Sequence, residues 1–83
     1  MFEVLCINDK GRPGEVPGSQ WVKQNEIYTV IKVVNCLGQG IQGYELEEIK
    51  IDAALYKYFA ASRFSPLAPL EPIKEEELEE ISI

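Results

Sequence analysis

The sequence predicts a small all-β domain, and features of length, composition and spacing indicate it. The chain has 83 residues, which bounds it to one domain with a modest core. Residues 23–34, "KQNEIYTVIKVV", run from a polar turn into β-branched and aromatic side chains, which suit the pleated surface of a strand. All six glycines lie in two loops, residues 11–18 and 38–43, and loops of this kind separate extended segments.

The first predicted strand is short and apolar and covers residues 3–8. The loop that follows, residues 8–20, is near the upper length that compact domains carry without a function. Its Lys10 and Arg12 are therefore candidate partner-binding residues. The alternative is a plain loop that folds back on the domain and is pinned there by Val16.

The clearest strand covers residues 26–34, after residues 21–23 have resumed extended structure. Side chains alternate along a strand, so one face carries Ile27, Thr29, Ile31 and Val33, and the other carries Tyr28, Val30, Lys32 and Val34. Both faces are thus mainly apolar. Such a strand suits a small curved barrel, in which the sheet folds over itself.

Residues 44–62 leave two structures open. As a helix they would align an apolar stripe at helical spacing, formed by Leu46, Ile49, Ala53, Tyr56 and Ala60. As a strand, residues 44–49 would return after the glycine-rich loop, and Asp52 would cap a short helical turn over residues 53–58. Residues 62–67 then give a last short strand.

The acidity of the chain is concentrated at one end. Residues 1–70 hold eight acidic and seven basic side chains, whereas residues 71–83 hold six Glu and one Lys. Neither part offers the basic stripe that a phosphate backbone requires, so nucleic acid is not the expected partner. Residues 1–70 are expected to form the domain and to fold without residues 71–83. Because clustered Glu side chains repel one another, that acidic tail is expected to be mobile, as a disordered segment or a frayed helix.

A sharper reading of the acidic tail is a docking peptide. Its acidic side chains would steer it to a basic groove, and Leu78, Ile81 and Ile83 are the candidate docking residues. An acidic inhibitor that imitates nucleic acid is a further alternative, although the charge would then have to cover a folded surface.

The composition argues against catalysis and against a metal site. The chain has no histidine, so it has no Ser-His or Cys-His pair to activate a nucleophile. Glu45 and Glu47 would share a strand face, and a solvated face opposite Leu46 is the expected arrangement. Cys6 and Cys36 are too few for a structural zinc site and are expected as reduced, buried thiols. The sequence therefore predicts no catalytic residue, no metal ligand and no cofactor.

The apolar stretches of the chain are short. None approaches the roughly 18 residues that span a bilayer, and residues 1–11 lack the basic segment and apolar run of a signal peptide. The sequence therefore predicts a cytoplasmic location and no membrane partner.

The stretches "VLCINDKGRPGEVP", "WVKQNEIYTVIKV", "GYELEEIKID" and "YFAASRFSPL" together resemble small uncharacterised proteins of bacteroidete-type bacteria and their phages or prophages. Those proteins are similar to SH3-like barrels, and the resemblance covers about residues 1–67. It implies an SH3-like barrel of about five short strands with one short helical turn, and it favours a strand for residues 44–49. Where that group carries Gly after the turn lysine, this chain has Gln24 and Asn25, and Asn tolerates the left-handed conformation.

The expected function is a non-enzymatic protein-interaction module of phage or prophage origin, with a protein partner and a monomeric or weakly dimeric chain. SH3 domains line a peptide groove with exposed aromatic side chains. Trp21, Tyr28 and Tyr44 are the aromatic candidates beside Lys10 and Arg12, and most other rings are expected in the core. A nucleic-acid-associated accessory factor is the alternative function, against which the near-neutral charge of residues 1–70 argues.

Overall fold

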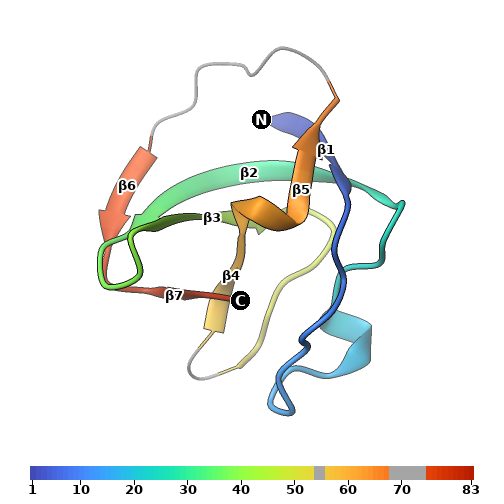
Figure 1. Ribbon diagram of the computed structural model, residues 1–83, viewed down its shortest axis with the longest axis horizontal. Helices are drawn as coiled ribbons and strands as arrows, with labels where there is room; N and C mark the ends of the chain where they lie inside the picture. The colour runs from blue at the N-terminus through green and yellow to red at the C-terminus, as the bar shows by residue number, and fades with distance from the viewer. Residues whose placement is uncertain (54–55, 68–74) are drawn as a thin grey trace.

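The computed structural model describes residues 1–53, 56–67 and 75–83. Within them, seven strands form a mixed, open sheet with the order β5-β1-β2-β3-β4-β7, and β6 pairs with β2 off this path (Figure 1). The strands are β1 (Phe2–Cys6), β2 (Ile27–Cys36), β3 (Ile41–Leu46), β4 (Tyr56–Ala60), β5 (Phe64–Pro66), β6 (Glu75–Leu78) and β7 (Ile81–Ser82). The regular helical structure in the described chain is limited to two 3₁₀ turns, η1 (Gly18–Gln20) and η2 (Ala61–Arg63).

The predicted all-β class is confirmed, and β3 confirms a strand at residues 44–46. The asparagine of the turn before β2 is left-handed as expected, with φ of 74° at Asn25. Two details differ. Residues 21–23 lie outside the strands, and no pairing of β5 with β4 or β7 closes the described strands into a barrel.

β4 corrects the expected helical turn over residues 53–58. Residues 54–55 lie outside the described chain, but Tyr56–Ala60 is a strand whose Phe59 pairs opposite Tyr44 of β3. Tyr58 and Phe59 are adjacent, and each is buried in a different apolar cluster. Only a strand sends adjacent side chains to opposite faces, so burial on both faces overrides the helical spacing. Asp52 does not cap a helix here, and its backbone N–H donates to Gln20 Oε1 at 2.9 Å.

β2 is the longest strand and has three neighbours. It pairs antiparallel with β1 through residues 27–30 and with β3 through residues 30–36. On the edge that β1 leaves free, residues 33–36 pair with β6 in parallel. A register shift between Val30 and Lys32 interrupts the pairing with β3.

The buried side chains form two clusters. The main core gathers Phe2, Val4, Cys6, Val16, Trp21, Val22, Tyr28, Val30, Val33, Tyr44, Leu46, Phe59 and Phe64. A second cluster consists of Val34, Cys36 and Tyr58, with Leu78 packed against it. β2 is buried on both faces at Val33 and Val34, which are adjacent and belong to different clusters, but the predicted grouping of its side chains is wrong. Ile27 and Ile31 are 52% and 40% exposed, and Val33 joins Tyr28 and Val30 in the main core, because the register shift between Val30 and Lys32 changes the face on which the later side chains lie. The second cluster is covered by Leu78, near the C-terminus, and not by a closed barrel. Cys6 and Cys36 are free and buried, as expected.

The acidic tail is ordered in its described part, which corrects the expected disordered segment or frayed helix. Residues 75–83, hereafter the C-terminal segment, contribute β6 and β7, which pair in parallel with β2 and β4 (Figure 1). The second cluster offers Leu78 an apolar surface, while Glu75–Glu77 remain exposed. Charge repulsion is reduced because successive strand side chains point to opposite faces. Residues 71–74 lie outside the described chain.

Candidate peptide-binding site

The three aromatic residues predicted to bind a partner lie in the main core. Trp21, Tyr28 and Tyr44 are 8%, 7% and 8% exposed. The hydroxyl of Tyr28 accepts the Lys23 backbone N–H at 2.8 Å, and burial raises the pKa of the phenols of Tyr28 and Tyr44. These rings pack with Phe2, Phe59 and Phe64. They therefore build the core instead of lining an open aromatic groove.

The loop of residues 8–20 is held against the rest of the chain. Val16 is completely buried in the main core, and Arg12 Nη1 donates to the Val16 carbonyl. Trp21 Nε1 donates to the Asp9 carbonyl at 2.6 Å. The side chains of Lys10 and Arg12 are exposed, so the structure brings neither of them together with an aromatic surface. This is the geometry of the plain loop pinned by Val16.

Arg63, which the sequence did not single out, joins three parts of the chain. Its Nη1 donates to the carbonyls of Asn8 at 3.2 Å and Lys10 at 2.6 Å, and its Nε donates to the main-chain oxygen of Ile83 at 2.5 Å. The guanidinium lies 4.8 Å from the centre of the Trp21 ring, within cation–π range. Burial lowers the pKa of Arg63 below its ordinary value, and the group stays charged. No local motif marks this role, because two of its partners are 53 and 55 positions away.

Ser82 is clamped by the side chain of Gln39, in the turn between β2 and β3. Gln39 Nε2 donates to the Ser82 carbonyl at 3.1 Å, and the Ser82 N–H donates to Gln39 Oε1 at 2.8 Å. A side-chain amide thus makes the same two-way exchange as a hydrogen-bonded pair in an antiparallel ladder. The Ser82 hydroxyl also lies 3.0 Å from Cys36 Sγ, in hydrogen-bonding contact.

Gly43 of β3 provides the space into which the Ser82 side chain fits. A Cβ on Gly43 would lie 2.1 Å from Ser82 Oγ and 2.9 Å from Tyr58 Cβ. Gly43 therefore allows the close approach of two chain segments, which is one reason for glycine inside a strand. We call Cys36, Gln39, Gly43 and Tyr58 the serine site. Glycine-rich spacing predicted a loop here, and nothing in the sequence tells that Gly43 faces Ser82.

Main-chain hydrogen bonds attach the C-terminal segment to β4. The Ile83 N–H donates to the Tyr58 carbonyl at 3.0 Å, and the Ala60 N–H donates to the Ile83 oxygen at 3.3 Å. In the register, Ile81 lies opposite Tyr56 and Ser82 opposite Tyr58. The segment therefore adds to the sheet as an edge strand, in the way an extended peptide binds by strand addition.

The three predicted docking residues of the tail have different environments. Leu78 is half-buried on the second cluster, and Ile83 is half-buried against the main core. Ile81 is 41% exposed. Two of the three thus contact an apolar surface of their own chain.

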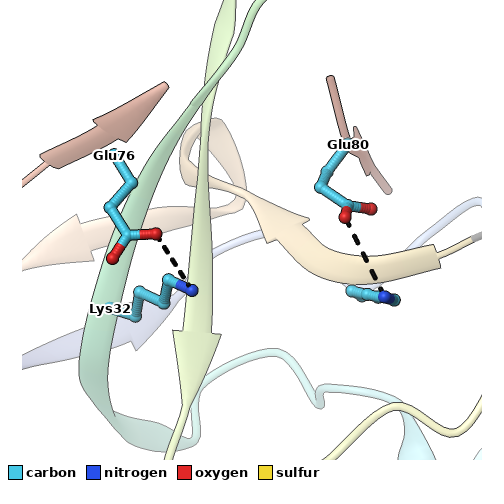
Figure 2. A network of polar contacts seen from close by, with 4 residues as sticks. Lys32, Glu76 and Glu80 are labelled. Carbon is cyan, nitrogen blue, oxygen red and sulfur yellow. Dashed lines mark ion pairs between the residues drawn. The ribbon is translucent and has the colours of Figure 1, made fainter. Parts of the chain in front are cut away.

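Two ion pairs join glutamates of the C-terminal segment to lysines of β2 and β4. Figure 2 shows Lys32 beside Glu76, with Nζ and Oε2 separated by 3.3 Å, and Glu80 with its ion-pair partner. That partner is Lys57, whose Nζ lies 3.9 Å from Glu80 Oε1. The hydrogen bond with Glu76 raises the pKa of Lys32. Exposed ion pairs of this kind contribute between zero and about 1 kcal/mol each to stability. They therefore orient the C-terminal segment more than they stabilise its attachment.

Of the three carboxylates at and just after the end of β3, Glu48 has a structural role that the sequence did not assign. Glu48 accepts the Thr29 N–H at 2.8 and 3.1 Å and the Thr29 hydroxyl at 2.8 Å, next to the register shift in β2. Glu47 is exposed and Glu45 half-exposed. Across residues 1–53, 56–67 and 75–83, no group of three or more His, Cys, Asp and Glu side chains is arranged to hold a metal ion. No helix in the same ranges is long and apolar enough to cross a membrane.

A hollow of about 530 Å³ lies between the end of β3, residues 49–53 and β4. Its lining mixes Leu46 and Ile49 with charged side chains of both signs, including Glu45 and Lys57. The serine site is therefore the best-defined recognition geometry in the described chain.

Comparison of the chain with protein-family models, with curated proteins and with solved structures gives no match. The family resemblance drawn from the sequence stays a prediction, and the function is argued from the site alone.

Proposed function

We propose that the chain is a non-enzymatic protein-interaction module of the SH3-like type, which binds an extended peptide by adding it to the sheet as a strand. The order of elements supports the SH3-like description. A long loop separates β1 from β2, a hairpin joins β2 to β3, and the 3₁₀ turn η2 leads from β4 into β5, which pairs with β1.

The observation that carries the proposal is the clamp of Gln39 on the Ser82 backbone. Recognition by strand addition takes affinity from main-chain hydrogen bonds and specificity from pockets for alternate side chains. The serine site has both components, because Tyr58 and Ala60 supply main-chain partners and Gly43 supplies a space for one small side chain. Gln39 adds a backbone contact that is independent of the ligand's sequence.

The two alternatives gain less from the geometry. An acidic inhibitor is supported by the exposed Glu77, but Glu76 and Glu80 are paired with lysines of the same chain. A nucleic-acid-associated factor needs a continuous basic surface, and Lys32 and Lys57 are engaged in those pairs, while the exposed Lys10 and Arg12 belong to the loop of residues 8–20.

Selection from a library of random short peptides tests the proposal. The bait is the full chain with Ser82→Tyr, a side chain too large for the space above Gly43, so that the serine site is vacated. The control bait carries Ser82→Tyr with Gly43→Val, which fills that space. Peptides are expected to enrich on the first bait and not on the second, with both baits shown to be folded by circular dichroism. Equal enrichment on the two folded baits, or none on either, would contradict strand-addition binding at this site.

A further inference from the structure

The serine site is occupied in the structure by the protein's own C-terminal segment. The inference drawn below from this occupancy rests on the proposed function, and it concerns the chemistry of the peptide that the serine site binds. Because the segment makes main-chain, side-chain and ion-pair contacts at once, each of its positions reports what the site accepts.

The central position requires a small side chain. The room above Gly43 holds the Ser82 hydroxyl with almost no clearance, and Cys36 Sγ is its polar neighbour. Ser82 is only 6% exposed, so a longer side chain could not turn out toward solvent without breaking the Gln39 clamp. Ser fits with a hydrogen bond, and Ala fits without one.

Two positions of the segment prefer aliphatic side chains, the one directly after Ser82 and the one four residues before it, whereas Ile81 is exposed. Ile83 packs against the main core, and its oxygen accepts hydrogen bonds from Arg63 Nε and the Ala60 N–H. Further toward the N-terminus of the segment, Leu78 covers the second cluster, and the Leu37 N–H donates to its carbonyl at 3.0 Å.

The charge preference is acidic. Lys32 faces Glu76 and Lys57 faces Glu80 (Figure 2). A basic peptide would place like charges against both lysines, which is destabilising.

We infer that the partner of the serine site is an acidic, extended peptide with Ser or Ala at the central position, an aliphatic residue directly after it and another aliphatic residue four positions before it. The C-terminal segment is then a resident competitor that this partner displaces. A competitor on the same chain binds intramolecularly, at an effective concentration that a free peptide has to exceed. The wild-type chain therefore binds a free peptide more weakly than a chain whose own segment cannot dock.

The test uses a fluorescent synthetic peptide with the sequence of residues 75–83 and measures its anisotropy with full-length protein. The chain with Ser82→Tyr is expected to bind this peptide at least about ten-fold more tightly than the wild-type chain, as removal of a tethered competitor requires. A matched peptide with Tyr in place of the serine is expected not to bind. Equal affinity of the two peptides, or of the two chains, overturns the inference.

A second measurement covers the case in which the Ser82→Tyr chain fails to fold. An excess of unlabelled peptide is added to isotope-labelled wild-type protein, and the Gln39 side-chain amide and the Gly43 backbone amide are followed by NMR. Shifts at both groups support displacement, and their absence at saturating peptide overturns it. A wild-type chain that dimerises through this edge, with free peptide unable to compete, also overturns it in favour of a second copy as the partner.

The failures of the two proposals are distinguishable. If the peptide library yields site-dependent binders that are basic or lack a small residue followed by an aliphatic one, the module function stands and the ligand chemistry is wrong. If the library yields no site-dependent binder, the module function itself is wrong.

Discussion

Gly43 is the residue on which the docking of Ser82 depends most directly. Glycine here is required for space, because a Cβ would enter the volume of the Ser82 hydroxyl. Gly43→Ala is expected to displace Ser82 and to lower the free energy of unfolding by about 1–3 kcal/mol, the usual cost of overpacking. Urea denaturation of the wild-type and Gly43→Ala chains measures this difference in the free energy of unfolding.

Gly38 provides the matched control for that substitution. A Cβ at Gly38 meets no other atom within 4 Å, so Gly38→Ala is expected to change the free energy of unfolding by no more than about 0.5 kcal/mol. Equal losses for the two variants would show that the space above Gly43 has no special role.

Arg63 is expected to resist conservative replacement. Its guanidinium bonds the carbonyls of Asn8 and Lys10 and the oxygen of Ile83 at the same time, and a lysine ammonium lacks that planar fork. Arg63→Lys should therefore lower the free energy of unfolding by about 1.5–3 kcal/mol, the range for hydrogen bonds to charged groups. Arg12→Lys is the control, since Arg12 is exposed and bonds only its own loop. The idea fails if thermal denaturation shows the same midpoint for both variants.

The labelling rates of the two thiols report separately on the main core and on the docking of the C-terminal segment. Both are buried, and burial raises the pKa of Cys6, so both should react slowly with a thiol reagent in the native protein. Cys36 contacts Ser82, whereas Cys6 belongs to the main core. In the Ser82→Tyr chain, Cys36 should label faster while Cys6 stays slow. Rapid labelling of both in the wild type, or parallel acceleration of both, would contradict this arrangement.

At the scale of elements, β6 and β7 belong to the sheet by their pairing. A chain that ends at residue 74 loses Leu78 from the second cluster and Ile83 from the main core. Burial of one large aliphatic side chain stabilises by about 1.5–3 kcal/mol when complete, and these two are half-buried. The midpoint should fall by at least about 4–8 °C, the shift for 1 kcal/mol in a domain this small.

This expectation reverses the one drawn from the sequence, in which residues 71–83 were dispensable. Thermal denaturation of the full and truncated chains decides between them. An unchanged thermal midpoint would show that the C-terminal segment does not stabilise the rest of the chain. Glu77→Gln is the control and should leave the midpoint unchanged. Glu77 is exposed and makes no ion pair within residues 1–53, 56–67 and 75–83.

The elements that could be predicted are those with local signals. β2 follows from its β-branched residues, and the turn at Asn25 follows from the conformational tolerance of asparagine. β4 and β7 could not be predicted, because their strand character comes from partners far along the chain, such as Tyr44 opposite Phe59 of β4 and Tyr58 opposite Ser82 of β7. A run of glutamates carries no strand pattern, so the order of the C-terminal segment depends on contacts that only the fold creates.

At the scale of the whole molecule, size explains why the three aromatic candidates are buried. A domain of 83 residues buries a smaller fraction of its unfolded surface than a large domain does, about 60%, and it uses Trp21, Tyr28 and Tyr44 as core. The recognition geometry instead uses Gln39, Gly43 and Arg63, whose roles depend on tertiary position. The all-β class followed from the sequence, but the open, mixed sheet did not, because parallel pairing is set by where the C-terminal segment returns.

The central claim is that residues 81–83 are docked on the serine site in the free protein. Amide hydrogen exchange of the full chain, read by NMR at Ser82 and Ile83, tests it most directly. These amides donate to Gln39 Oε1 and to the Tyr58 carbonyl, so both should exchange at least about ten-fold more slowly than in an unstructured peptide, as expected for an edge element that opens locally. Exchange of both amides at the rate of an unstructured peptide would contradict the account.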